Sequence, residues 1–395
     1  MKRIVLVFSL LLLLAFHFSA LAAPGQPASP AAADSSTALC LPGIYLDDPG
    51  DCLPGGPSAY YTEMSELGIT FPMTSVVTSK PDPSLTQLDT RYGEVRNPKA
   101  PVFGSIEEAN NGKKSAAIQT INSSFAYISY TDEAVVDGKR FYMIQPSAWM
   151  RANDISRLGA VPLFQGLLIR QTPDHAFGWV INYRSPDPVQ SKRTPGYQLQ
   201  DYTGHEFKNY EIINVYGETK VNDETWFMVG PDEWLPYYHV ARVIPDTVPP
   251  EGVTGDRWIE VNLQDQTLAV YDNRQLVFAT LIASGLEPFW TRPGVFQISQ
   301  KLESTPMTGS FEVDRSDAYY LEDVPWTMYF DNARALHGAY WRAKLGFPQS
   351  HGCVNMSVGD SHWLFDWASV GDYVYVWDPS GKTPTDPSVY SGGGY

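Results

Sequence analysis

The sequence predicts a mainly β protein with several domains, and three observations support this. Its 395 residues exceed the length at which a single hydrophobic core usually divides, about 250–300 residues. Aromatic residues make up 13% of the chain, which favours strands, and 31 glycines and 31 prolines favour turns. Short runs of alternating apolar and polar residues recur between turn signals. We expect two small β-barrels followed by a β-sandwich with one main helix.

The composition excludes several classes of protein. The chain has 28 Lys and Arg against 44 Asp and Glu, a formal net charge of −16. Nucleic acids and anionic membranes are bound by net basic faces, so we expect no nucleic-acid partner. The hydrophobic content of 43% argues against a disordered chain.

The N-terminus has the three parts of a secretory signal peptide. Lys2 and Arg3 precede an apolar stretch at 4–15, and a small-x-small cleavage sequence follows at 20–22. We expect residues 1–22 to be removed, and the alternative is an uncleaved membrane anchor. Either way, export places the protein outside the cytoplasm, in the cell wall or periplasm.

The three cysteines divide into a pair and a single thiol. Disulfides persist in exported proteins, and Cys40 and Cys52 lie close together in a segment rich in Pro and Gly. We expect them to form one disulfide within an N-terminal linker segment at 23–90. Cys353 is then unpaired.

The middle of the chain contains an internal repeat with an offset of 85 residues. The sequence 141–146 recurs at 226–231, and turn signals such as Asp137-Gly138 separate the alternating runs. We expect two antiparallel β domains at 91–160 and 161–245, which resemble bacterial SH3-like barrels. Immunoglobulin-like modules are the alternative. We interpret their aromatic residues as core, with glycan binding by exposed rings as the other interpretation.

A Pro-rich linker at 246–256 leads to the last domain, which we place at 257–378. Its alternating runs and turn residues predict strands at 258–263, 267–271 and 276–283, a helix at 358–369 and a strand at 373–377. The end of the chain, 379–395, contains three consecutive glycines and is expected to be a disordered tail.

The chemically informative segment is His337-Gly338 followed by Ser-His-Gly-Cys-Val-Asn at 350–355. A thiolate is a strong nucleophile, and a nearby imidazole accepts the proton of the thiol and stabilises the resulting ion pair. Gly352 allows a sharp turn, so that consecutive amides point at one spot as an oxyanion hole. The pattern predicts Cys353 as a nucleophile with a histidine base.

Three other interpretations of this segment are open. Cys353 packs as a small hydrophobe if it is a core thiol. His337, His351 and Cys353 are a possible metal set, but His-x-Cys is not a usual zinc spacing and we expect no metal. A cysteine peptidase of the NlpC type is the third, although there the cysteine precedes its histidine.

Residues 258–377 resemble the L,D-transpeptidases with a YkuD-like catalytic domain. The signature of that family is His-Gly, a spacer, and Ser/Thr-His-Gly-Cys-x-Asn or -Arg, which stand here as His337-Gly338 and 350–355. Ser284-Gly285 also matches. Arg292-Pro293 departs from the usual Thr-Pro-Thr-Gly at a strand turn.

The resemblance implies a peptidoglycan L,D-transpeptidase, an acyltransferase without a cofactor. Cys353 would attack the donor stem peptide, release D-alanine and form a thioester. His337 would transfer the proton, oriented by the carbonyl of Gly338. An amine of a second stem peptide would then form a 3→3 cross-link. The alternatives are an L,D-carboxypeptidase that uses water, and a wall-binding or structural protein with a vestigial catalytic domain.

The resemblance also implies supporting residues and ligands. The oxyanion hole and its loop would be formed by Ser350, His351, Gly352 and Asn355. A lid over the donor peptide, at about 301–324, would contain Met307, Tyr319 and Tyr320. Peptidoglycan stem peptides are the expected partners as donor and acceptor, and carbapenem-type β-lactams are the expected inhibitors.

Overall fold

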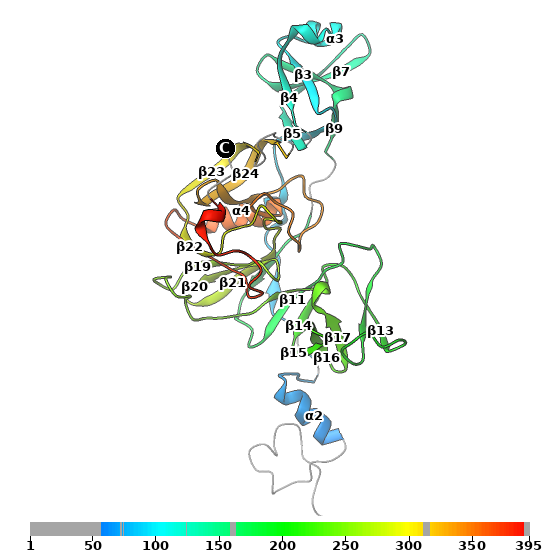
Figure 1. Cartoon of the computed structure of the whole chain (residues 1–395), viewed down its shortest axis with the longest axis vertical. Coiled ribbons are helices and arrows are strands. Elements are labelled where there is room, and N and C mark those ends of the chain that lie inside the picture. The colour runs from blue at the N-terminus through cyan, green and yellow to red at the C-terminus, as the bar shows by residue number, and fades with distance from the viewer. Residues whose placement is uncertain are drawn as a thin grey trace, which may run out of the picture. The chain divides into compact units, whose positions relative to one another are not determined.

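The computed structural model describes residues 57–71, 73, 75–123, 125–158, 163–310 and 317–390 (Figure 1). The predicted signal peptide and the Cys40–Cys52 pair lie outside these residues. The chain divides into two compact units, Met1–Glu66 and Leu67–Tyr395. In the first unit the described element is the helix α2 (Pro57–Glu66). No helix in the described part of the chain is long and apolar enough to cross a membrane.

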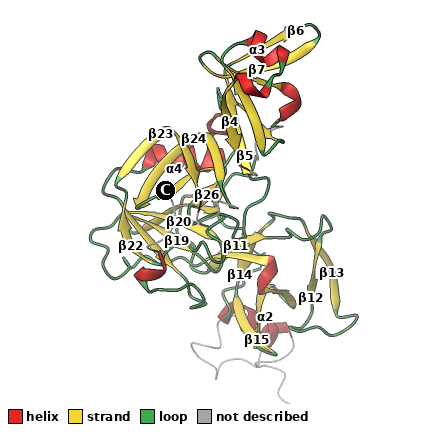
Figure 2. Ribbon diagram, turned by 45° about the horizontal axis from the view of Figure 1, so that its top comes forward, coloured by secondary structure: helices red, strands yellow, loops and turns green. Residues whose placement is uncertain are grey.

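The second unit consists mainly of strands, which confirms the predicted mainly β class (Figure 2). Its described α-helices are α3 (Ile106–Asn111) and α4 (Val358–Trp367). Two short strands precede and follow the first repeat, β1 (Thr78–Ser79) and β10 (Leu167–Ile169).

The two repeats have equivalent strands. The first contains β2 (Arg91–Val95), β3 (Lys99–Phe103), β4 (Ala117–Asn122), β5 (Phe125–Tyr130), β6 (Asp132–Val136), β7 (Lys139–Gln145), β8 (Ala148–Arg151) and β9 (Ile155–Arg157). The second contains β11 (Ala176–Val180), β12 (Val189–Lys192), β13 (Tyr202–Phe207), β14 (Ile212–Val215), β15 (Gly217–Val221), β16 (Glu224–Gly230), β17 (Glu233–Pro236) and β18 (Val240–Val243).

The sheet order is the same in both copies. A five-stranded sheet runs β4-β3-β8-β7-β6 in the first repeat and β13-β12-β17-β16-β15 in the second. The hairpin turns also match, because Asp137-Gly138 and Asn222-Asp223 all have positive φ, as a tight two-residue turn requires. The antiparallel β content of the repeats follows their sequence pattern, while their assignment as SH3-like barrels stays a prediction.

The last domain is built on two seven-stranded sheets. One sheet has the order β1-β10-β21-β20-β19-β27-β22, with β19 (Trp258–Asn262), β20 (Thr267–Asp272), β21 (Gln275–Leu281), β22 (Gly294–Gln297) and β27 (Tyr373–Trp377). The other has the order β26-β25-β24-β5-β2-β9, and β23 also pairs with β24. Its own strands are β23 (Gln300–Gly309), β24 (Tyr319–Asp331), β25 (Arg334–Gly338) and β26 (Val354–Met356).

The hydrophobic core lies between these two sheets. Ile259 and Val261 of β19 belong to one buried cluster with Met328 of β24, Leu336 of β25 and Leu364 of α4. Burial of each such side chain contributes about 1.5–3 kcal/mol. The predicted meander, the single helix of this domain and the final strand are therefore all present in the sandwich.

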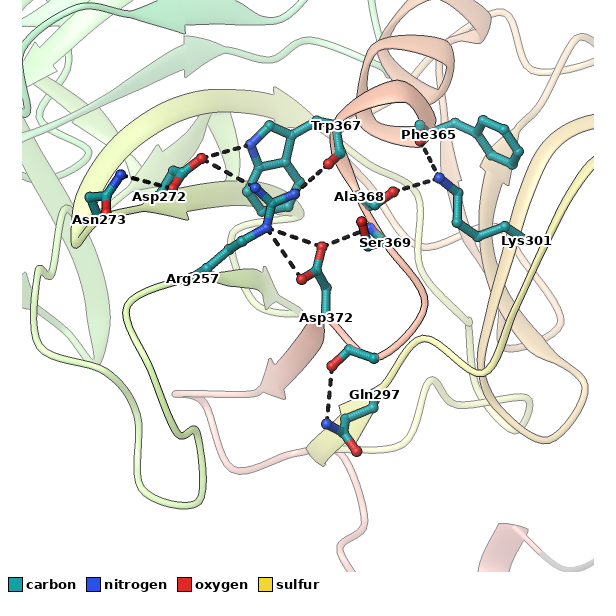
Figure 3. A network of polar contacts seen from close by, with 11 residues as sticks. Arg257, Asp272, Asn273, Gln297, Lys301, Phe365, Trp367, Ala368, Ser369 and Asp372 are labelled. Atoms are coloured by element: carbon teal, nitrogen blue, oxygen red, sulfur yellow. Dashed lines mark hydrogen bonds and ion pairs between the residues drawn. The ribbon is translucent and has the colours of Figure 1, made fainter.

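The C-terminal end of α4 is held by two cations (Figure 3). The ammonium group of Lys301 donates to the carbonyls of Phe365 and Ala368, at 2.6 and 2.5 Å. The guanidinium of Arg257 donates to the carbonyl of Trp367 and lies 3.5 Å from the centre of its ring. Cations at this end satisfy the last carbonyls and oppose the helix dipole. The end of the helix is thereby tied to β23, which carries Lys301, and to the segment before β19, which carries Arg257.

The expectation of a disordered tail at 379–395 is wrong for residues 379–390. They include a short 3-10 helix, Pro387–Tyr390. The Tyr390 ring is buried, its hydroxyl donates to the carbonyl of Pro384 at 2.6 Å, and the guanidinium of Arg334 lies 5.0 Å from its centre. Burial of an aromatic ring against a cation gives this Gly- and Pro-rich segment a fixed place.

Candidate active site

Two adjacent parallel strands bring the halves of the motif together. In the register of β25 and β26, Leu336 pairs with Val354 and His337 pairs with Asn355. Asn355 also forms an isolated bridge with Ala283, beyond the end of β21. The Ser284-Gly285 sequence is thus placed beside residues 349–353, which we call the cysteine loop. The amides of Gln349 and Ser350 both donate to the carbonyl of Ser284 at 2.9 Å.

His337 is held at both ring nitrogens. Its Nδ1 lies 3.1 Å from the carbonyl oxygen of Gly338, and its Nε2 lies 3.1 Å from Nδ2 of Asn355. The side chain is 1% exposed, and this burial lowers the pKa of His337 to about 4 against the opposing effect of the Gly338 carbonyl. The imidazole is therefore neutral at neutral pH.

Cys353 is half-buried at the end of the loop before β26. Its sulfur lies 3.7 Å from the carbonyl oxygen of Ala333. Burial raises the pKa of the thiol, and the positive charge of Arg334 opposes that shift. In the described part of the chain no hydrogen bond joins the sulfur to His337, and burial disfavours the charged form of both groups.

The cysteine loop is braced by two hydroxyls. Ser350 Oγ donates to the carbonyl of Cys353 at 2.5 Å and accepts from the amide of Gly352 at 3.1 Å. Thr291 Oγ1 donates to the carbonyl of Gly352 and accepts from the amide of Gly285, both at 2.9 Å. Gly352 has φ +112°, which L side chains rarely adopt. Sequence reasoning identified Ser350 but missed Thr291, which lies outside the motif.

A buried ion triad lies beside the loop. The carboxylate of Asp331 is within 2.7 Å of an Arg292 nitrogen and 3.2 Å of an Arg334 nitrogen. Arg334 Nε is also 3.4 Å from the carbonyl of Trp290. Arg292, where the chain departs from the family pattern, is thus part of the wall of the site. No local motif marks this triad, because Arg292 precedes β22 whereas Asp331 and Arg334 flank the turn between β24 and β25.

The predicted lid is a hairpin of β23 and β24, and its three residues face different surroundings. The ring of Tyr319 lies 5.3 Å from that of His351, which also contacts Phe289 at 4.6 Å. Tyr320 instead donates to Glu322 at 2.7 Å and packs against the core of the first repeat. Met307 is buried in a cluster with Tyr92 and Tyr127 of that repeat and with residues of the last domain, and Cys353 packs against this cluster. The structure therefore brings Tyr319 and Met307 to the site and directs Tyr320 toward the repeat.

The lid strand is joined to the first repeat. β5 pairs in parallel with β24, with Phe125 opposite Tyr319 and Tyr127 opposite Leu321. The hydroxyl of Ser123 donates to the carbonyl of Ala318 at 2.7 Å. Sequence reasoning missed this junction, because backbone pairing between distant segments leaves no local sequence signal.

The structure also bears on the metal-site and glycan-binding interpretations of the sequence. The part of the chain that the structure describes contains no group of three His, Cys, Asp or Glu side chains that could hold a metal ion. In the second repeat, Trp226 is core, while Tyr197 and Tyr202 are exposed at the rim of a cavity of about 260 Å³. Aromatic residues of that repeat are therefore both core and surface, and glycan binding stays untested.

Comparison with known proteins identifies the last domain. Residues 256–376 match the model of the L,D-transpeptidase catalytic domain, the YkuD family. This part of the chain is therefore an L,D-transpeptidase catalytic domain. A search of curated proteins gives no match.

Several solved L,D-transpeptidases are similar to the chain. A mutant of the Enterococcus faecium enzyme is 26% identical over 31% of this chain and 50% of its own, with a TM-score of 0.29. The ertapenem-acylated catalytic domain of the E. faecium enzyme is 28% identical over 32% of this chain and 100% of its own, with a TM-score of 0.29. Mycobacterium tuberculosis L,D-transpeptidase 1 is 20% identical over 37% of this chain and 76% of its own, with a TM-score of 0.27. The chain thus spans about half the length of the first of these.

Proposed function

We propose that this chain is a peptidoglycan L,D-transpeptidase in which Cys353 is the nucleophile and His337 takes and returns the proton. The observation that carries the proposal is the register of β25 and β26, which sets His337 opposite Asn355, two residues after the cysteine. The family match at 256–376 supports the same reaction class.

In the first half-reaction, the sulfur of Cys353 attacks the carbonyl carbon of the L,D-peptide bond in the donor stem. Nε2 of His337, which lies 3.1 Å from the Asn355 amide at rest, exchanges that contact for the thiol and takes its proton, and backbone amides of the 351–353 loop stabilise the oxyanion. The C–N bond then breaks, His337 gives the proton to the leaving D-alanine amine, and a thioester remains. The amide of Gly352 already donates to Ser350 at rest, so it joins the oxyanion hole only after that bond is exchanged.

In the second half-reaction, a side-chain amine of an acceptor stem attacks the thioester carbonyl. The amine loses a proton to His337, the sulfur leaves and regains the proton, and a 3→3 cross-link is released. Water in place of the amine gives an L,D-carboxypeptidase. Met307, Tyr319 and Tyr320 belong to the lid that covers the donor, with Tyr319 beside His351, Met307 in the cluster that Cys353 packs against, and Tyr320 on the core of the first repeat.

The resting state of the pair has a consequence for this reaction. Burial disfavours both charged forms, because it lowers the pKa of His337 to about 4 and raises that of the Cys353 thiol. The proton therefore moves when the substrate carbonyl is in place and the oxyanion forms, and not beforehand. This protects the thiol from oxidation before substrate binds.

The surroundings of the protein follow from this function. Peptidoglycan lies outside the cytoplasm, which agrees with the signal peptide expected at 1–22. Carbapenems are the proposed inhibitors, because a β-lactam carbonyl presents the same acylation chemistry to the thiol. Two of the similar structures are described as an imipenem complex and an ertapenem-acylated domain.

The test compares the wild-type chain with Cys353→Ala. The wild type should gain the mass of one carbapenem and convert tetrapeptide stems to cross-linked dimers, while the variant should do neither. Cross-linking by Cys353→Ala would refute the nucleophile. A folded wild type with a reduced thiol that is not acylated would favour a wall-binding protein, and retention of the full chain on sacculi would then test that alternative. Tripeptide in place of dimer would identify the carboxypeptidase.

A further inference from the structure

Arg342 contacts the residue that contacts His337. It lies in the loop between β25 and the cysteine segment and is half-buried. Its Nε is 3.3 Å from Oδ1 of Asn355, and Nη2 donates to the carbonyl of Gln349 at 2.5 Å. Burial lowers the pKa of Arg342 to about 10, so the guanidinium remains charged at neutral pH. The loop thus presents a fixed cation to the side-chain oxygen of Asn355.

The donor or acceptor character of each atom determines the direction of the hydrogen bonds that link Arg342, Asn355 and His337. A guanidinium only donates, so the Asn355 atom that faces it must be the oxygen. The Asn355 atom 3.1 Å from Nε2 of His337 is then the amide nitrogen, which only donates. Nε2 must therefore carry a lone pair, and the proton lies on Nδ1, where the Gly338 carbonyl accepts it. This is the tautomer that a proton acceptor for the thiol requires.

We propose that Arg342 is a positioning residue that fixes the amide orientation of Asn355 and, through it, the His337 tautomer with Nε2 free of a proton. This inference rests on the proposed function, in which Nε2 receives the proton of Cys353. Without Arg342, the amide of Asn355 can turn over, and its oxygen then accepts a proton from Nε2. Because the Gly338 carbonyl still accepts from Nδ1, that arrangement favours the imidazolium, which does not accept a proton at Nε2.

The first repeat supplies the surface on which Arg342 rests. The guanidinium lies 5.6 Å from the centre of the Phe125 ring, and Tyr127 lies on the same strand, β5. Tyr127 also lies 6.1 Å from the ring of Trp341. Because β5 pairs with β24, these two aromatic residues have fixed positions relative to the catalytic sheet. The repeat therefore contributes to the positioning of the histidine.

Other titratable groups lie on the elements packed against β25. They are Tyr319, Tyr320, Glu322, Asp323, Tyr329 and Asp331 on β24, Asp360, His362 and Asp366 on α4, and Cys353 before β26. The charge that shifts His337 is that of Arg342, which lowers its pKa in addition to the larger effect of burial. Electrostatics and hydrogen-bond polarity thus act in the same direction, against protonation of Nε2.

The decisive experiment measures the carbapenem acylation rate against pH for wild type, Arg342→Ala, Arg342→Lys and the control Lys344→Ala. Lys344 lies in the same loop and donates to the carbonyl of Tyr183 at 3.1 Å, outside the contacts to Asn355. Arg342→Ala should slow acylation on the order of 10- to 100-fold and move the acidic limb of the profile to higher pH. Arg342→Lys should recover part of the rate, and Lys344→Ala should match wild type.

A second measurement separates this inference from the proposed function. Nitrogen-15 NMR of His337 in the Cys353→Ala chain reports the tautomer without any acylation. The Nδ1–H tautomer in that chain, lost on adding Arg342→Ala, would support the proposal. An unchanged tautomer and an unchanged pH profile in the Arg342 variants would overturn it. Failure of the wild type to be acylated would count against the proposed function alone.

Discussion

The two repeats have the same strand order but contact the loop between β25 and β26, residues 339–353, in different ways. In the first, β5 begins at Phe125 and pairs with the lid strand β24. In the second, the equivalent position is Tyr210, which has φ +67° and lies before the start of β14. Tyr210 accepts from the amide of Leu345 at 3.0 Å. Equivalent positions thus contact one loop, Phe125 by its ring at Arg342 and Tyr210 by its hydroxyl at Leu345.

This difference shows how a duplicated module acquires two roles. A strand that stays extended adds its backbone to a neighbouring sheet, as β5 does. A residue with positive φ, such as Tyr210, interrupts the extended backbone. The contact with the neighbouring loop is then made by a side chain and not by backbone pairing. The first repeat therefore fixes the lid and Arg342, and the second fixes the course of the loop. Matched variants in the two repeats should therefore differ in their effects on acylation.

Replacement of the equivalent core isoleucines should have different effects in the two repeats. Ile128 and Ile213 are both buried, so Ile128→Ala and Ile213→Ala should each cost about 2–4 kcal/mol of stability. Only Ile128→Ala should also slow carbapenem acylation, because it loosens β5 beside the β24 pairing. Urea unfolding and acylation rates measure the two effects. Equal slowing by both variants would contradict the division of roles.

Asp360, which contacts the segment leading into the second repeat, should make the stability of the protein depend on pH. Its carboxylate accepts from the amide of Gly166, before β10, and from Thr280 Oγ1, at 2.9 and 2.6 Å. Burial raises the pKa of Asp360 from 3.8 to about 6. The contribution of this carboxyl group to the free energy of unfolding is complete below pH 3.8 and is lost as the pH rises through about 6. Thermal unfolding between pH 4 and 8 should show this slope, and Asp360→Asn should flatten it. An equal slope in the variant would assign it to other buried acids.

Ser129 should connect the first repeat to the lid. Its hydroxyl donates to Asp323 at 2.5 Å, and its amide donates to Glu322 at 2.9 Å. Ser129→Ala should cost about 1–2 kcal/mol, because a partly buried carboxylate loses its hydroxyl donor. Hydrogen exchange of β24 should become faster, and Ser129→Thr should retain most of the protection. Unchanged exchange in Ser129→Ala would show that backbone pairing alone holds the lid.

Tyr210→Phe should give the smallest effect. The substitution keeps the ring and removes the hydrogen bonds to the backbone of Leu345, which should cost about 1 kcal/mol. The pH profile of acylation should stay that of the wild type, because Arg342 keeps its contacts. A shifted acidic limb in Tyr210→Phe would show that the second repeat also positions His337.

Part of this molecule could be predicted because it depends on local sequence. The strand 373–377 was predicted with the bounds that the structure has, and the helix predicted at 358–369 ends at Trp367. Alternation, turn residues and a helical apolar face are readable within a short window. The SH3-like assignment went beyond what such windows determine, and it stays a prediction.

The tail and the wall of the site could not be predicted, because both depend on contacts between distant residues. A segment rich in Gly and Pro indicates disorder, yet Tyr390 finds the guanidinium of Arg334. Asp331 likewise needs both Arg292 and Arg334 beside it, and the bracing role of Thr291 depends on a turn that lies against the cysteine loop.

The sequence alone is enough to propose the reacting groups, because the chemistry of that proposal needs Cys353, His337 and the glycines of a short motif. How those groups are held depends on contacts between residues that are far apart in the chain. Arg342 has no motif of its own, and it matters because the polarity of its hydrogen bond to Asn355 sets which nitrogen of His337 carries the proton. The pairing of β5 with β24 is equally invisible in the sequence, since backbone groups pair without regard to side-chain identity.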